Sequence, residues 1–297
     1  MLDVVVVGAG SAGLSAALVL GRARRHTLVL DGGPPRNAPS PAAHSFFTRD
    51  GDVPLELLAL GREQLRPYDT VQLRAAQATR IERIGNGFEV VLGDGSTESA
   101  RRIVLATGVT DRLPPIDGVG RLWGRGVIHC PFCHGWEVRD QPLAIHGRGR
   151  EGIEFARLLL GWSRDLILCS DGPAELTGDE RAFLGRHAIG LKEERIVRVE
   201  GETGLDRIVF ADGSVLERTA LFMRPPWVLR SDLSRQLACE HAEDGTVRVN
   251  EHGKTSVPGV YAAGDMITGA HQVVLAAASG ARSALAIQRE LVFEDYA

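Results

Sequence analysis

The sequence predicts an α/β fold with two Rossmann-like three-layer nucleotide-binding domains, one inserted in the other. Three observations predict it. A strand, a glycine-rich turn, a helix and a second strand open the chain, the same pattern begins again at Gln141, and a strand near the C-terminus ends on Gly264-Asp265. Because Gly264-Asp265 must join the same site as the first glycine turn, we expect an outer domain of residues 1–112 and 229–297 and an inserted domain of residues 113–228.

The first pattern has the features of a dinucleotide-binding unit. Residues 2–7 are a β-branched run that predicts a strand, residues 8–13 have the spacing G-x-G-x-x-G, and a helix is expected over 11–20. A second strand over 27–30 ends at Asp31, 18 positions after the third glycine. In such a unit the glycines let the backbone approach a pyrophosphate at the helix N-terminus, and the acid accepts hydrogen bonds from ribose hydroxyls.

A hairpin and a central strand are expected next. Residues 87–92 predict a strand, residues 93–96 a turn, and residues 103–105 a strand that leads into Ala106-Thr107-Gly108. These small residues suit a backbone that lies against a flat or phosphorylated ligand, and they suit a simple turn equally well. The proline-rich stretch 113–118 breaks regular structure and predicts the domain boundary.

The second pattern repeats the first in the middle of the chain. A strand is expected over 142–146, a glycine loop over 147–152, a helix from Glu151 to Trp162 and a strand over 166–168. Two dinucleotide-like units in one chain indicate an internal duplication of architecture.

The last third of the chain returns to the outer domain. A carboxylate at the carboxyl end of a strand in a doubly wound sheet lies at the ligand crevice, which places Asp265 there. A long alanine-rich helix is expected to follow over 269–288.

Composition excludes several classes of function. The chain has 297 residues, 44% of them hydrophobic and 24% charged, which is the balance of a folded globular protein. A net charge of −4 provides no excess of positive charge for a nucleic-acid backbone. No apolar run approaches the roughly 20 residues of a membrane span, and no basic segment precedes an apolar one, so we expect a cytoplasmic protein with no membrane partner.

Four cysteines are too few for a disulfide framework in a chain of this length. Cys169 and Cys239 stand alone and predict buried thiols. Cys130 and Cys133 form a C-x-x-C motif, which can be a zinc half-site, a structural disulfide or a redox dithiol. No second ligand pair completes a zinc site and a structural disulfide is rare in the cytosol, so the redox dithiol is favoured and no metal is expected.

These motifs together resemble those of the low-molecular-weight thioredoxin reductase family of flavoproteins over nearly the whole chain. The four that match, in the family's order, are Gly8 to Gly13, the segment Trp123 to Cys133, the second glycine loop, and Gly264-Asp265 with its following helix. The segment Asp31 to Asn37 and the histidine after the dithiol are similar to those of a subgroup of dithiol oxidases that includes gliotoxin reductase.

The resemblance implies FAD in the outer domain and homodimers. The residues that it implies for FAD binding are Gly8, Gly10, Ser11, Ala12, Gly13, Asp31, Arg36, Asn37, His44, Ala106, Thr107, Gly108, Asp265, His271, Gln272 and Val273. Relatives usually carry arginine where His271 stands. The helix that begins there would stabilise negative charge on the reduced flavin.

The resemblance also implies roles for the dithiol. Cys133 would receive electrons from the flavin, and Cys130 would attack the disulfide of a thioredoxin-like protein or a small substrate. Relatives commonly place an aspartate after the dithiol as proton donor, and here that position is His134, which titrates near neutrality. The other interpretation of His134 is a residue that only caps the next helix.

The second glycine loop departs from the family. NADPH-dependent members follow the second strand with a histidine and two arginines, whereas this chain has Cys169 to Gly172, where Asp171 would repel a 2′-phosphate. Arg148, Arg150 and Glu151 replace small or acidic residues. We therefore expect no productive NADPH binding. Three alternatives remain for an enzyme: NADH or NADPH bound in an unusual way as electron donor, ferredoxin as electron donor, or oxygen as electron acceptor in a dithiol oxidase. A fourth alternative is a non-catalytic flavin-binding sensor.

The C-terminus offers one more hypothesis about the donor. Some relatives without a nicotinamide site cover the flavin with a C-terminal aromatic residue, and this chain ends in residues 293–297, which include Tyr296. Tyr296 would either stack on the flavin or belong to a frayed end.

Overall fold

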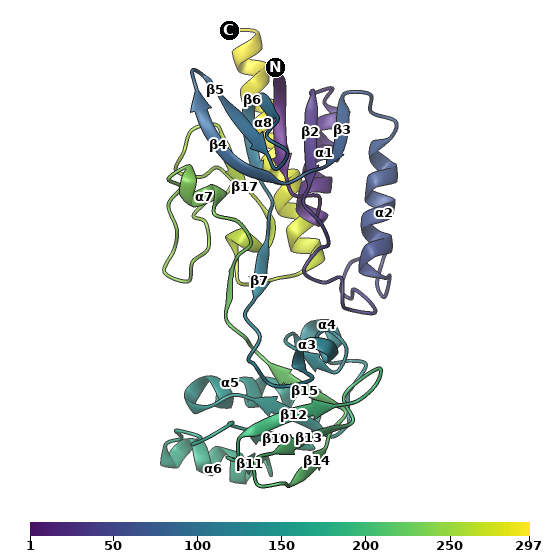
Figure 1. Cartoon of the computed structure of the whole chain (residues 1–297), viewed down its shortest axis with the longest axis vertical. Helices are drawn as coiled ribbons and strands as arrows, with labels where there is room; N and C mark the ends of the chain where they lie inside the picture. The colour runs from purple at the N-terminus through teal and green to yellow at the C-terminus, as the bar shows by residue number, and fades with distance from the viewer. The chain divides into compact units, whose positions relative to one another are not determined.

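The computed structural model describes residues 1–297 and divides into two compact units. Unit 1 comprises Met1–Ala38, Ser45–Thr110 and Trp227–Ala297, and unit 2 comprises Pro39–His44 and Asp111–Pro226. The chain has the α/β fold that the sequence predicts, with parallel Rossmann-like sheets in both units (Figure 1). The short segment Pro39–His44 groups with unit 2, a feature that the sequence gives no sign of.

Unit 1 is built on a seven-stranded sheet in the order β3-β2-β1-β6-β5-β4, with β17 paired to β6. Its strands are β1 (Leu2–Val7), β2 (Thr27–Asp31), β3 (Val71–Ala75), β4 (Ala78–Ile84), β5 (Gly87–Leu92), β6 (Thr97–Leu105) and β17 (Val260–Ala262). Strand β6 is longer than the expected 103–105. Its first half pairs antiparallel with β5 and its second half parallel with β17, so the hairpin and the Rossmann strands share one sheet.

Helices cover one face of this sheet. They are α1 (Ser11–Arg22), α2 (Pro54–Leu65) and α8 (Val273–Asp295), and they bury Val4, Val6, Val29 and Val104 against apolar residues such as Leu20 and Ile287. The alternate residues of the same strands, among them Val5 and Val7, pack on the opposite face, which α7 (Leu233–Gln236) and the chain that leads to β17 cover. Both faces are apolar because the parallel strands are buried on both sides.

Helix α8 packs directly on α1. A Cβ atom added to Gly280 would lie 1.9 Å from the carbonyl oxygen of Ala12, so the two backbones approach more closely than any larger residue would allow. The helix begins at Val273 and ends at Asp295, where the sequence predicted residues 269–288.

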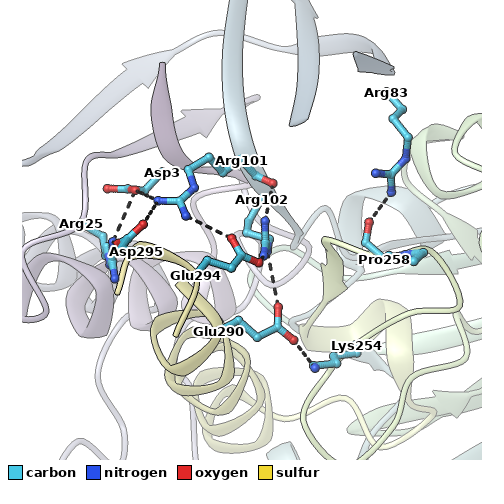
Figure 2. A network of polar contacts seen from close by, with 10 residues as sticks. All are labelled: Asp3, Arg25, Arg83, Arg101, Arg102, Lys254, Pro258, Glu290, Glu294 and Asp295. Atoms are coloured by element: carbon cyan, nitrogen blue, oxygen red, sulfur yellow. Dashed lines mark hydrogen bonds and ion pairs between the residues drawn. The ribbon is translucent and has the colours of Figure 1, made fainter. Parts of the chain in front are cut away.

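Ion pairs hold the last turns of α8 (Figure 2). Asp295 lies 2.6 Å from Arg25 and 2.7 Å from Arg101, while Glu294 pairs with Arg101 at 3.0 Å and with Arg102. These arginines and Asp3 lie where β1 begins, and Arg25 and Arg101 both contact the Asp3 carboxylate. In the same turns Leu291 is fully buried in the core beside Ala284 and Ile287, so apolar packing and ion pairs both occur in the extra helical turns.

Unit 2 has a second parallel sheet in the order β11-β10-β9-β15-β8. Its strands are β8 (Val127–Ile128), β9 (Leu143–His146), β10 (Leu166–Cys169), β11 (Gly190–Lys192) and β15 (Ala220–Met223). Helices α5 (Gly149–Leu159) and α6 (Gly178–Arg186) cover one face. The other face packs on α3 (Val119–Leu122) and on a three-stranded antiparallel sheet of β12 (Ile196–Glu200), β13 (Arg207–Phe210) and β14 (Val215–Glu217).

Four short elements complete the structure. They are β7 (Val109–Asp111), which pairs with β16 (Trp227–Leu229), α4 (Pro131–His134) and the 3-10 helix η1 (Gly264–Ile267). No helix is long and apolar enough to cross a membrane. Cys169 and Cys239 are buried free thiols, and burial raises the pKa of Cys169 to about 12.

Candidate active site

Unit 1 gathers its predicted cofactor residues at one edge of the sheet. Strands β1, β2, β6 and β17 are parallel in their pairing, so their carboxyl ends lie together. The glycine loop after β1, Asp31 at the end of β2, Ala106 after β6 and Asp265 after β17 therefore share this edge. That arrangement is the ligand crevice of a doubly wound sheet.

The glycine loop has the close contacts that its sequence predicts. Gly8 has a positive φ of 115°, and a Cβ there would lie 2.3 Å from the carbonyl oxygen of Ala106. A Cβ on Gly13 would lie 1.8 Å from the Gly8 oxygen. Gly10 differs, because no atom lies within 4 Å of the position that its Cβ would take.

Helix α1 begins at this loop with no side-chain cap and no acid in its first turn. No protein side chain caps its first amide groups, and the Cβ position of the N-cap residue Gly10 borders open space. An uncapped N-terminus next to open space and a permissive glycine fits the pyrophosphate of a dinucleotide.

Asp31 is held in place at the end of β2. One carboxylate oxygen accepts a hydrogen bond from the Gly33 amide at 3.1 Å, and the other lies 2.8 Å from Arg62 of α2. Each carboxylate oxygen keeps acceptor capacity for a further donor. Sequence reasoning missed Arg62, since nothing in the spacing of residues 31 and 62 indicates the contact.

Arg36, Asp265 and His271 converge although the sequence separates them widely. The Arg36 guanidinium lies 3.5 Å from the Asp265 carboxylate and 2.6 Å from Nδ1 of His271. Arginine can only donate, so Nδ1 of His271 is the acceptor in this contact. Trp227 lies edge-on to the imidazole, with ring centroids 5.6 Å apart. The structure therefore brings three of the predicted cofactor residues together at this edge.

The other predicted cofactor residues divide between the units. Gln272 is the N-cap residue of α8, Val273 its first residue, and the Thr107 hydroxyl accepts a hydrogen bond from Ser231 at 3.2 Å. His44 is different, because it belongs to unit 2, where its Nε2 lies 3.4 Å from Glu137.

Tyr296 lies at the other end of unit 1. Its side chain is 86% exposed, and the neighbouring Asp295 contacts residues beside the start of β1, whereas the glycine loop follows the end of that strand. At about 3.3 Å per residue, the five residues from Asp3 to Gly8 span roughly 16 Å. The structure thus does not bring Tyr296 to the glycine loop of its own chain.

The two cysteines of the C-x-x-C motif form a disulfide in unit 2. Cys130 and Cys133 are joined, with their Cα atoms 5.3 Å apart, in a turn that begins α4. Pro131 at the first helical position fixes the turn, and Phe132 lies edge-on to Trp162 at 5.3 Å between centroids. Both cysteines are partly exposed, whereas Cys169 and Cys239 are buried.

His134 ends this turn with one ring nitrogen bound and the other free. Nε2 lies 2.9 Å from the hydroxyl of Ser40, and Nδ1 is buried with no hydrogen-bond partner. Burial lowers the pKa of His134, while the Glu137 carboxylate raises it, His44 lowers it and the backbone carbonyl of Cys130 raises it. The imidazole is therefore neutral near pH 7 and can accept a proton. Ser40 is a second residue that sequence reasoning missed.

The second glycine loop contacts the loop that follows β10. The Gly149 amide at the start of α5 donates to the carbonyl oxygen of Ala174 at 2.8 Å, and the Arg148 guanidinium donates to the carbonyl oxygen of Asp171 at 2.9 Å. Glu175 also lies 3.8 Å from Arg148. The loop after β10 thus uses groups that a bound pyrophosphate would need.

Asp171 is an internal anchor in unit 2. One carboxylate oxygen accepts the Ile196 amide at 2.7 Å, and the other lies 3.8 Å from Nε2 of His146. An acid with these partners holds the loop after β10 in place.

Comparisons with known proteins agree with this arrangement. The family described as pyridine nucleotide-disulphide oxidoreductase matches residues 2–281. Thioredoxin reductase sirT of Leptosphaeria maculans is 32% identical over 100% of this chain and 96% of its own length. Among solved structures, HlmI is 40% identical with a TM-score of 0.95, covering 99% of this chain and 94% of its own. The putative thioredoxin reductase TrxB from Bacillus anthracis is 33% identical with a TM-score of 0.94, covering 99% and 100%.

Proposed function

Because the chain belongs to the pyridine nucleotide-disulphide oxidoreductase family, as a thioredoxin reductase-like flavoprotein, we propose that it is an FAD-dependent enzyme that exchanges electrons between the flavin, the Cys130–Cys133 pair and a thioredoxin-type protein or small dithiol. The observation that carries the proposal is the partly exposed disulfide in the turn that begins α4, with the His134 imidazole directly after it.

In this proposal the edge of the unit 1 sheet holds the cofactor. The amides of Ser11, Ala12 and Gly13 bind the pyrophosphate of FAD. Asp31 binds its ribose, and Arg36 and Asp265 contact the remaining part of the cofactor. The uncapped α1 and the open space at Gly10 support this assignment. Bound FAD supplies the two-electron exchange with the dithiol.

Thiol–disulfide exchange is the chemistry proposed for the Cys130–Cys133 pair. A substrate thiolate attacks Cys130, the bond to Cys133 breaks, and Cys133 leaves as a thiolate. The second substrate thiol then attacks the mixed disulfide and releases Cys130, so that the substrate is oxidised and the pair is reduced. His134 accepts a proton released by a thiol and returns it to Cys130. Run in reverse, the same steps reduce a thioredoxin-type disulfide.

We propose further that neither NADPH nor NADH is the donor. Three contacts of the second glycine loop support this: Gly149 to Ala174, Arg148 to Asp171, and Asp171 to Ile196. Glu151 in the first turn of α5 adds negative charge where a pyrophosphate would bind. Without a nicotinamide donor, ferredoxin is the candidate electron donor for the reduction of a substrate disulfide. Independently of the electron donor, we propose that the protein is a homodimer.

The contacts of Gly149 and Arg148 with the loop after β10 favour a second candidate, a dithiol oxidase, because this enzyme class needs no nicotinamide donor. In that direction the substrate dithiol itself supplies the two electrons, dioxygen accepts them, and hydrogen peroxide is the product. No nicotinamide site is required.

A turnover assay separates these directions. The purified flavoprotein is given dithiothreitol in air, and oxygen consumption and peroxide are measured; in parallel, thioredoxin reduction is measured with NADPH. We expect oxygen consumption with dithiol, its loss in Cys130→Ser, and full activity in the control Cys239→Ser, whose thiol is buried. Reduction of thioredoxin at micromolar NADPH would refute the donor assignment, and dithiol oxidation that survives Cys130→Ser would refute the role of the pair.

A further inference from the structure

The contact between Ser40 and His134 specifies which ring nitrogen carries the proton. The Ser40 hydroxyl donates to the carbonyl oxygen of Ala42 at 2.7 Å and lies 2.9 Å from Nε2 of His134. A hydroxyl has one hydrogen, and here it is directed to Ala42. Ser40 must then accept from His134, so Nε2 bears the hydrogen of the neutral imidazole and Nδ1 bears the lone pair.

The free nitrogen belongs to the turn of the dithiol. Cys130 is the N-cap residue of α4 and His134 its last residue, and the His134 amide donates to the Cys130 carbonyl oxygen at 3.2 Å. Nδ1 is bonded next to the Cβ attachment, so it stays close to this turn, while Nε2 reaches outward to Ser40. Nδ1 is also buried with no hydrogen-bond partner.

Ser40 is fixed independently of His134. Its side chain is 8% exposed, and the segment Pro39–His44 groups with unit 2. A Cβ on Gly124 would lie 3.2 Å from the Ser40 amide nitrogen, and Arg125 donates to the Pro39 carbonyl oxygen at 3.4 Å. The hydroxyl is thus held by backbone contacts that do not involve the imidazole.

We propose that Ser40 is a positioning residue that fixes His134 as its Nε2–H tautomer, so that Nδ1 accepts the proton of the Cys130 thiol. The inference rests on the proposed function and adds a residue to it. In the reduced pair, the Cys130 S–H bond breaks, the proton goes to Nδ1, and the electron pair stays on sulfur as the thiolate. The same proton returns to Cys130 when exchange releases that sulfur.

The charged and titratable groups that face His134 are His44 and Glu137, which pair with each other at 3.4 Å, and the backbone carbonyl of Cys130 also raises the pKa of the imidazole. The fields of His44 and Glu137 act on the imidazole in opposite directions, so neither substitutes for the hydrogen bond from Nε2 to Ser40.

The test measures the thiolate of Cys130 directly. In a Cys133→Ser background, with FAD bound, the rate of iodoacetamide alkylation at Cys130 is measured by mass spectrometry from pH 5 to 10. We expect Ser40→Ala to slow alkylation at pH 7 by about threefold to tenfold and to move the midpoint of the profile towards the ordinary cysteine value of about 8.5. Ser40→Thr keeps the hydroxyl and should retain the original profile.

Two further variants separate positioning from folding. His134→Ala should shift the profile at least as far as Ser40→Ala, and adding Ser40→Ala to His134→Ala should produce no additional shift. Thermal unfolding of each variant is measured alongside. An unchanged profile in Ser40→Ala, or an additional shift in the double variant, would overturn the proposal. If dithiol turnover is absent in the unmodified protein, the proposed function fails, while the alkylation profiles still report on Ser40.

Discussion

Gly280→Ala tests whether the packing of α8 on α1 supports the candidate cofactor site. The new Cβ would lie 1.9 Å from the Ala12 oxygen and 2.7 Å from its carbonyl carbon, and both are backbone atoms that no rotamer change can move. Ordinary contact begins at 3.4 Å, so the helices must separate by up to about 1.5 Å, the difference between 3.4 and 1.9.

The size of the effect follows from two opposing contributions. Overpacking of this kind costs about 1–3 kcal/mol, and the clash with backbone places this substitution at the upper end. Alanine returns at most about 1 kcal/mol of helix propensity. A net loss of about 2 kcal/mol corresponds to a fall of roughly 4–8 °C in Tm for a domain of this size.

The assay is thermal unfolding together with the flavin content of the purified protein. Because Ala12 lies in the first turn of α1, its displacement should also weaken FAD retention. The control is Gly185→Ala in α6, where no atom lies within 4 Å of the added Cβ, and it should be neutral or stabilising. A Gly280→Ala protein with an unchanged Tm and full flavin content would refute the reasoning.

Three other predictions concern the dithiol and the C-terminus. On reduction, Cys130→Ser should show a flavin–thiolate charge-transfer band and Cys133→Ser should not; the reverse pattern would exchange their roles. Since burial lowers the pKa of His134, the acidic limb of the turnover profile should lie below the ordinary imidazole value of about 6.5, and an unchanged limb in His134→Ala would contradict this. Deleting residues 293–297 should lower Tm by removing the ion pairs of Glu294 and Asp295 and leave flavin fluorescence unchanged, whereas a fluorescence change would bring Tyr296 back into the site.

Local patterns carried much of the fold. The strand, glycine loop and helix at the start of each unit are contiguous in sequence, and the helix found over Ser11–Arg22 begins where the pattern placed it. The second helix begins at Gly149, two residues before the expected Glu151, because the glycine loop itself forms its first turn. Such elements are predictable since their glycines and apolar spacing act over a few residues.

Elements that depend on distant partners could not be predicted in this way. The last residue of α8, Asp295, pairs with Arg25 and Arg101, which are distant in sequence, and these contacts cannot be predicted from the apolar spacing that Leu291 continues. The expected strand over 103–105 was too short for a different reason, because the polar first half of β6 is ordered by pairing with β5, its neighbour across the turn at 93–96.

The candidate site shows the same division. Cys130, Cys133 and His134 were identifiable from spacing, whereas Ser40 lies 94 residues from its partner and carries no motif. The absence of productive NADPH binding stays a prediction, which the sequence bases on the missing arginines, on Asp171 and on the charged loop residues. The structure adds contacts that the sequence did not predict, since Asp171 accepts the Ile196 amide and Gly149 donates to the Ala174 carbonyl oxygen.

The most direct test of the account is anaerobic rapid mixing of the oxidised flavoprotein with one donor at a time. The flavin absorbance is followed after addition of NADPH, NADH, reduced ferredoxin or a small dithiol. The account predicts that dithiol bleaches the flavin through the Cys130–Cys133 pair, and that NADPH and NADH at micromolar concentration leave it oxidised. Rapid bleaching by either nicotinamide nucleotide would contradict the central claim.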